Sequence, residues 1–339
     1  MGTERKLLKW LSVALIFAVI LLTPLLTLAG GGQHAIHGLT GAIPGVTPPP
    51  GLYFADFNGW YGAKKLKDNS GDTLKLERDG VEFDKLNVFF AAPSLTWISK
   101  YNILGASYGQ RYIGVGLLIE NEVDVLTPGG PLRLDETRAG IFDFIWAPIV
   151  LGWHRKDGLL HATAELDVFM PVGNPNPRNL VNINKNFWTF EPGFAVTGFS
   201  PFWDQRLAAS VWLRYDFNTV DDNFLISPGI ANKIGNPALA GVRTHNTPGQ
   251  EFHLDWAVDF AVYEKLRVGL LGFYYQQITD DETGRGTVRN DKGRTIGIGP
   301  HAWVPYKKWI FEGHVTTETG VKNRPQGVIA SFNVLYKIF

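Results

Sequence analysis

The stretch Glu251 to Val262, EFHLDWAVDFAV, places a large apolar residue at nearly every second position. Phe252, Leu254 and Trp256 begin the apolar set, and the alternate positions are mostly charged or polar. Successive side chains of a β-strand point to opposite faces. The stretch is therefore a strand with one apolar and one polar face, as a wall between lipid and a polar interior requires.

The same alternation recurs about twelve times between Gly51 and Phe339, in stretches of roughly 11 to 15 residues. The connections are alternately long and very short. This pattern predicts an all-β fold: a transmembrane antiparallel up-and-down β-barrel of about 12 strands, with long extracellular loops and short periplasmic turns. A soluble sandwich shares the period but seldom directs large apolar residues outward in every strand. The predicted strands are 51–62, 85–98, 101–119, 140–153, 158–170, 185–198, 206–217, 250–264, 266–279, 294–304, 307–318 and 327–339.

Composition excludes several other classes. Only one run, Leu7 to Ala29, approaches the ~20 apolar residues that a membrane-spanning helix needs, so a helical membrane protein is excluded. The formal net charge is +0 and the basic residues are scattered, so nucleic acid is not an expected partner. Cysteine is absent, which fits an exported chain without disulfides. Aromatic residues make up 13% of the chain, and the 11 Trp suit the interfacial girdles of a barrel.

The N-terminus predicts export and three segments. Arg5 and Lys6 precede an apolar run that ends in small residues, so residues 1–29 are predicted to be a secretory signal peptide, cleaved after Ala29. A retained inner-membrane anchor is the alternative. Residues 30–50 form a Gly/Pro-rich segment, either a spacer or a stub in the lumen, and residues 51–339 form the barrel. The predicted location is the outer membrane of a Gram-negative-type bacterium.

Residues Gly41 to Phe54, GAIPGVTPPPGLYF, stand between the signal and the first strand. This stretch and the barrel pattern resemble the outer-membrane family named for the meta pathway of phenol degradation, whose members are sometimes called transporters. The resemblance implies uptake of aromatic or other hydrophobic compounds and supplies no catalytic residues. The chain ends in Phe339, and the barrel-assembly machinery recognises terminal aromatic residues of this kind. Phe339 is nevertheless one residue out of phase with the apolar face of the last strand.

Polar residues on the predicted inner face are the candidates for function. Acidic groups outnumber basic ones, so an open water column would favour cations. Charge ladders between strands are the alternative, in which Arg214 pairs with Glu191 or Asp255. The lumen-lining candidates are Asp143, His161, Glu165, Asp167, Glu191, Arg214, Asp216, His253, Asp255, Asp259, Glu312 and His314.

The function predicted from these features is passive uptake of small hydrophobic, in particular aromatic, compounds. Its partners would be outer-membrane lipids, the assembly machinery and the solute. The outer mouth is predicted to carry Trp60, Tyr61, Tyr274 and Tyr275. A cation-preferring general diffusion porin and a non-conducting structural barrel are the alternatives. The loop 218–249 would either fold into the mouth or point outward.

Enzymatic activity is not expected. His253 and Asp255 lie two residues apart on one strand face and, with a third ligand, could hold a metal ion. Polar interior faces produce such pairs by chance, however, and no Gly-x-Ser-x-Gly elbow occurs. We therefore expect no catalytic residue, no cofactor and no metal.

Overall fold

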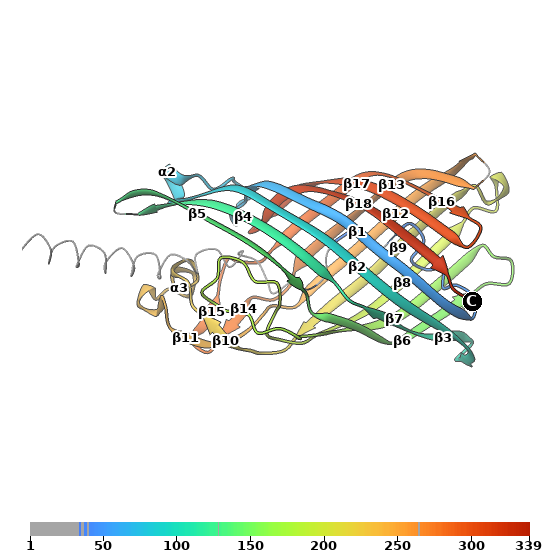
Figure 1. Ribbon diagram of the computed structural model, residues 1–339, viewed down its shortest axis with the longest axis horizontal. Helices are drawn as coiled ribbons and strands as arrows, with labels where there is room; N and C mark the ends of the chain where they lie inside the picture. The colour runs from blue at the N-terminus through green and yellow to red at the C-terminus, as the bar shows by residue number, and fades with distance from the viewer. Residues whose placement is uncertain (1–33, 35–36, 39–40, 128, 264) are drawn as a thin grey trace, which may run out of the picture.

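The computed structural model describes residue 34, residues 37–38, 41–127, 129–263 and 265–339. The predicted signal peptide, residues 1–29, lies outside the described residues. The described strands close into a single antiparallel barrel of 12 strands, which confirms the predicted fold class (Figure 1). Closure is made by β1, which bonds to β18 on one side and to β2 on the other. Among the described residues, no helix is long and apolar enough to span a bilayer.

The wall contains 14 hydrogen-bonded segments because two of its strands are interrupted. The pairs β3 with β4 and β5 with β6 each act as one strand. The segments are β1 (Gly51–Leu66), β2 (Val81–Ile103), β3 (Ala106–Ile113), β4 (Gly116–Thr127), β5 (Gly130–Ile141), β6 (Phe144–His154), β7 (Leu160–Met170), β8 (Thr189–Phe199), β9 (Leu207–Asn218), β12 (Glu251–Tyr263), β13 (Leu266–Gln277), β16 (Arg294–Tyr306), β17 (Trp309–Lys322) and β18 (Pro325–Lys337).

The two interruptions lie side by side and begin at a proline. Pro93 in β2 has no backbone N–H to donate to its neighbour. Beside it, the Gly114 N–H donates to the Pro93 carbonyl at 3.0 Å, and the Phe142 N–H donates to the Val115 carbonyl at 2.7 Å. Beyond this kink β5 pairs with β4 alone and ends the strand order. On its other side stands the connection 171–188, where the structure assigns no strand.

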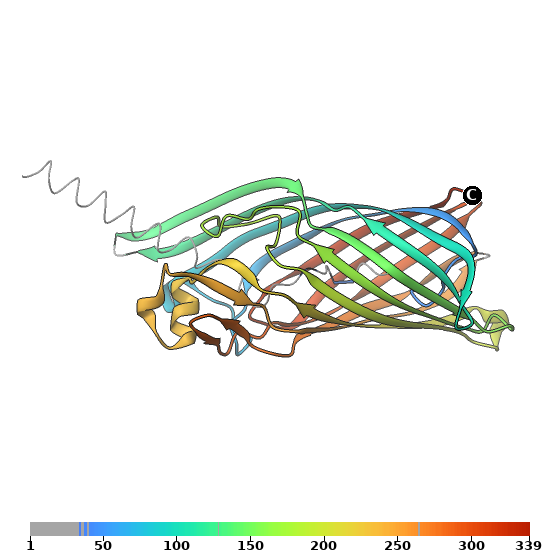
Figure 2. The same cartoon turned by 90° about the horizontal axis from the view of Figure 1, so that it is seen from below.

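Past the kink, β4 and β5 continue as a long hairpin (Figure 2). The interval 120–139, which lies between the predicted strands 101–119 and 140–153, is therefore not a loop. Val123 and Val125 are buried on the inner face, whereas Glu120 and Glu122 point outward. Where a strand extends beyond the lipid, its outward-facing side chains contact water and can be charged. The pattern of outward-facing apolar residues therefore ends before the strand itself ends. The gap between the predicted strands 307–318 and 327–339 likewise shortens to residues 323–324, because β17 ends at Lys322 and β18 begins at Pro325.

The loop 218–249 folds outward and joins the connection 278–293 in a second, four-stranded sheet. Ser227 begins its helix by accepting a hydrogen bond from the Ile230 N–H at 3.1 Å. This outer sheet lies at the end of the barrel opposite the C-terminus (Figure 1). Its elements are β10 (Asp221–Leu225), α3 (Pro228–Ile234), η3 (Pro237–Leu239), β11 (Arg243–Thr247), β14 (Asp281–Thr283) and β15 (Gly286–Val288), and the short α2 (Leu76–Asp79) ends the first loop.

Asp281 makes the outer sheet sensitive to pH. Its Oδ1 accepts the Gly249 N–H at 2.8 Å and a Gln277 side-chain N–H at 2.7 Å. Removal from water raises the pKa of Asp281 to about 6, from 3.8. A raised carboxyl pKa means that the folded sheet favours the protonated form. The contribution of Asp281 to the stability of the sheet is therefore fully present below pH 4 and is lost as the pH rises through about 6.

We expect amide hydrogens of β11 and β14 to exchange faster at pH 7.5 than at pH 5, after correction for intrinsic exchange. One pKa unit corresponds to about 1.4 kcal/mol, so the opening equilibrium should change by roughly tenfold or more. Asp281→Asn should remove most of this difference. An equal pH dependence in that variant would show that Asp281 is not its source.

Candidate functional site in the lumen

The described residues that precede the first strand lie inside the barrel. The two ring nitrogens of His34 contact Thr189 Oγ1 at 2.6 Å and Asp143 Oδ2 at 3.0 Å. Further along, the Gly45 N–H donates to Thr197 Oγ1 at 3.0 Å. These partners stand on opposite sides of the membrane span, because Thr189 begins β8 near the outer end and Thr197 lies near its periplasmic end. The described part of residues 34–50, here called the insert, thus runs down the lumen instead of forming an external spacer.

Small residues allow the insert to lie directly on the barrel wall. A Cβ added at Gly45 would stand 2.4 Å from the Thr197 backbone nitrogen, closer than atoms can approach. Two strands along the wall from Thr197, Thr47 occupies the space above Gly152 on β6, where an added Cβ would meet its Oγ1 at 2.2 Å. Thr47 also shares a hydrogen bond of 2.8 Å with Thr163. The glycines at these two contacts thus set how closely the insert fits.

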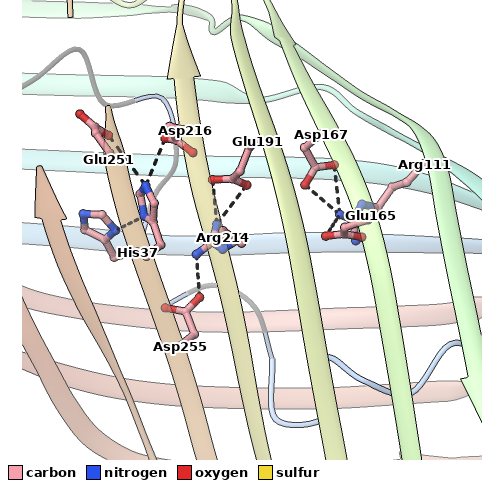
Figure 3. Close-up of polar contacts among 10 residues, drawn as sticks. His37, Arg111, Glu165, Asp167, Glu191, Arg214, Asp216, Glu251 and Asp255 are labelled. Atoms are coloured by element: carbon pink, nitrogen blue, oxygen red, sulfur yellow. Dashed lines mark hydrogen bonds and ion pairs between the residues drawn. The ribbon is translucent and has the colours of Figure 1, made fainter. Parts of the chain in front are cut away.

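Charged residues form ladders across the polar part of the wall (Figure 3). Arg214 on β9 donates to Asp255 Oδ2 on β12 at 2.7 Å and, more weakly, to Glu191 on β8 at 3.4 Å. Arg111 on β3 reaches Glu165 at 2.8 Å and Asp167 at 3.2 Å on β7. Arg214 thus connects β9 to both of its neighbours, and Arg111 reaches past β6 to connect β3 with β7.

A second group lies nearer the outer end and has fewer cations. His253 Nε2 is 3.1 Å from Asp216 Oδ2 and 3.8 Å from Glu251 Oε2. On the other side of the ring, His253 Nδ1 is 3.3 Å from Nδ1 of His37 in the insert. Ligand atoms of Glu191, Asp216 and His253 all lie within 4.8 Å of one another, a spacing that could hold a metal ion.

The structure buries all but one of the predicted lumen residues. The exception is His161, which is half-buried beside the periplasmic turn and contacts His154 at 2.7 Å. The buried residues are Asp143, Glu165, Asp167, Glu191, Arg214, Asp216, His253, Asp255, Asp259, Glu312 and His314.

Sequence reasoning missed four residues of the site. The two-residue period of their strands places Arg111 and Arg267 on the inner face. This period could have identified both arginines as partners of the acidic side chains. Arg267 pairs with Asp259. His34 and His37 precede the first strand, in a segment without periodicity, so no strand pattern could place them in the lumen.

The four predicted mouth aromatics do not form one surface. Tyr274 and Tyr275 are consecutive, so they face opposite sides of β13. Tyr275 is fully buried against the ring of His37, with centroids 4.5 Å apart. Trp60 and Tyr61 diverge likewise: Trp60 donates to Asn87 Oδ1 at 3.2 Å, and Tyr61 donates to Glu318 at 2.9 Å. At most one residue of each consecutive pair can therefore line the lumen, and a role of the four at the outer mouth stays a prediction.

The inner wall is apolar on the side of β1, β2, β4 and β5. Three clusters follow one another there, from the outer hairpin down to the kink. The residues of this apolar wall that are buried are Val123, Val125 and Leu180; Ala63, Leu66, Phe83 and Leu86; and Ala92, Val115, Phe142 and Phe169. The lowest cluster reaches the insert, because the ring of His34 lies 5.2 Å from that of Phe169.

The chain matches one protein-family model and is similar in fold to solved outer-membrane barrels. The family model described as "Putative MetA-pathway of phenol degradation" matches residues 66–334. An outer membrane channel from Pseudomonas putida F1 superposes with a TM-score of 0.63 at 11% identity, covering 90% of this chain and 99% of that one. This likeness shows the barrel fold alone.

Two other solved barrels are more distant. The KdgM porin gives a TM-score of 0.38 at 7% identity, with 84% of this chain and 99% of that chain covered. A FadL homologue of Pseudomonas aeruginosa gives 0.34 at 8% identity, with 85% and 90% covered. Neither score bears on the function of this chain. No curated protein sequence matches significantly.

Proposed function

The chain belongs to the outer-membrane channel family described as "Putative MetA-pathway of phenol degradation", and on this premise we propose that it admits small hydrophobic compounds, aromatic ones in particular. The solute would move passively from the cell surface along the apolar wall. The charged ladders opposite would hold the barrel and its insert in place. No residue has a catalytic role in this proposal.

The observation that carries the proposal is the apolar wall itself. It begins on the outer hairpin, where Val123 and Val125 face inward beneath Leu180, and it ends at the kink beside His34. Apolar surface attracts an aromatic solute from water at about 25 cal/mol per Å² removed from contact with water. The partly buried members of these clusters, such as Leu132 and Leu134, leave apolar surface that offers a solute successive sites of similar affinity. Passage needs this property because one tight site would trap the solute.

The insert argues against the general diffusion porin. Such a porin needs a continuous water column through the lumen. Here the insert contacts Thr197 and Thr163 on the neighbouring strands β8 and β7, and Gly41 lies against Glu312 on β17, five strands away from β8. The charged residues beside the insert are buried in protein contacts. An apolar solute needs no such column because it can move along side chains. Passage of hydrophobic compounds is therefore the function that this geometry favours.

Leu134→Asp tests the proposal. Leu134 packs on the apolar wall from β5 and is only partly buried, so the barrel should tolerate the change. A charge there should reduce the binding free energy of the solute by about the amount that two buried methylene groups contribute. At low solute concentration this loss corresponds to a roughly tenfold lower uptake rate. Uptake of labelled toluene by cells with a lipopolysaccharide outer leaflet measures the effect. Asp135→Asn, which alters the neighbouring exposed position of the same strand, is the control. Equal uptake by all three proteins would refute the proposal.

A further inference from the structure

We propose that the outer part of the lumen binds one divalent transition-metal ion, with zinc as the representative, through Glu191, Asp216 and His253. The site lies on the inner face of the adjacent strands β8, β9 and β12. Glu251, whose Oε2 is 3.8 Å from His253 Nε2, is close enough to be a fourth ligand. Imidazole nitrogen and carboxylate oxygens are ordinary zinc ligands. The ion site does not depend on which compound the channel carries.

The ligand atoms already converge. One atom each from Glu191, Asp216 and His253 lies within 4.8 Å of the other two. Metal bonds of about 2.0–2.2 Å bring tetrahedral ligands to about 3.4 Å from one another, so small rotations of the side chains complete the site. All three side chains are buried, and they come from three adjacent strands. The barrel therefore fixes their positions.

Unpaired carboxylate oxygens point to a missing cation. Both side-chain oxygens of Glu251 and Oδ1 of Asp216 are buried and make no hydrogen bond of normal geometry among the described residues, although the Tyr275 hydroxyl lies beside Glu251. These two residues are also directly opposite each other in the pairing of β12 with β9. Like charges in opposed positions repel, and a buried, uncompensated charge is costly. A divalent ion between them would remove both penalties.

Nearby arginines make no direct ion pair with Asp216 or Glu251 among the described residues, and Arg324 acts on Glu251 only through its charge. Arg214 makes its short contact, 2.7 Å, with Asp255 and reaches Glu191 only at 3.4 Å. Arg324 lies over the ring of Tyr275, with its guanidinium carbon 4.4 Å from the centroid. Glu191 is therefore loosely held and can turn toward the ion. The remaining alternative is that the carboxyl groups share protons.

His37 gives the site an outer shell. Nε2 of His253 faces the carboxylates, and its Nδ1 lies 3.3 Å from Nδ1 of His37. Metal-ligating histidines commonly use their second nitrogen for a hydrogen bond that fixes the ring. Here the partner belongs to the insert, and its ring stacks on Phe273 with centroids 5.3 Å apart. Binding of the ion would therefore hold the insert in the lumen.

Zinc titration of the full, chelator-treated chain in detergent tests the proposal by calorimetry and by metal analysis after gel filtration. We expect one zinc per chain. His253→Ala should abolish binding, and His37→Ala should weaken it by about 10- to 100-fold. His314→Ala, which removes another buried lumen histidine, should bind like the unaltered chain. Heat-modifiable migration on gels shows whether each variant retains the barrel.

The titration has clear contrary results. Absence of stoichiometric zinc in the unaltered, folded chain would overturn the proposal and leave shared protons as the explanation of the buried carboxylates. Equal binding by folded His253→Ala would place the zinc elsewhere and overturn it also. Should His253→Ala fail to fold, Glu191→Gln replaces it, because this change removes a ligand charge and keeps the side-chain volume. Retained affinity in a folded Glu191→Gln variant would likewise reject the site.

Discussion

Replacing Arg214 by Met is expected to lower the free energy of unfolding by about 3–5 kcal/mol. The guanidinium is buried between Glu191 and Asp255, and its loss would leave two carboxylates without their cation. Methionine keeps much of the side-chain length, so the lost charge dominates the effect. Urea unfolding in lipid vesicles, followed by tryptophan fluorescence, measures it.

The control for this variant is Arg155→Met. Arg155 pairs with Asp157 in an exposed periplasmic turn, with 63% of its side chain accessible. Such a surface pair contributes little. If the two variants were destabilised equally, the ladder centred on Arg214 would have no special part in holding the barrel.

Removing residues 34–48 is expected to raise the single-channel conductance several-fold. A barrel of 12 strands encloses more room than one of eight strands, whose side chains fill it, so an empty lumen should hold water. The insert occupies that room and contacts the wall at Thr163 and Thr197. Recordings of the refolded protein in a planar bilayer measure the change.

A cysteine tether supplies the matched control. The chain has no cysteine, so Thr47→Cys with Thr163→Cys introduces one defined pair at positions whose hydroxyls are 2.8 Å apart. The oxidised double variant, in which the disulfide fixes the insert to the wall, should show the same low conductance as the unaltered chain. Reducing the disulfide should not lower the conductance further. Unchanged conductance after the deletion would mean that something other than the insert closes the lumen.

The sequence predicts the transmembrane strands well because lipid contact is a local demand on every second residue. Stretches such as 251–262 satisfy that demand, and the structure places a strand on each of the twelve. The rule fails outside the lipid. On β4, residues such as Glu120 and Glu122 face water, so the outward-apolar pattern is lost although the strand continues to Thr127. In this part of β4 the apolar residues face inward and the polar residues face outward. That reversed alternation is the signal from which the predicted strand could have been extended.

The lumen residues follow from the same alternation, but their contacts do not. Strand period puts Asp216, His253 and Asp255 on the inner face, yet it cannot say that His253 meets Asp216 on the neighbouring strand instead of Asp255 on its own. That choice depends on strand register. The insert is harder still. His34 and His37 reach the lumen through contacts more than one hundred residues away in sequence, which no local pattern specifies.

By the function proposed above, the barrel passes hydrophobic compounds and not small hydrophilic ones. The direct test compares the entry of labelled toluene and labelled arabinose into cells with a lipopolysaccharide outer leaflet, with and without expression of the unaltered chain. Expression should raise the toluene rate and leave the arabinose rate unchanged. A rise in arabinose entry equal to that of toluene would contradict the account and identify the protein as a general diffusion porin.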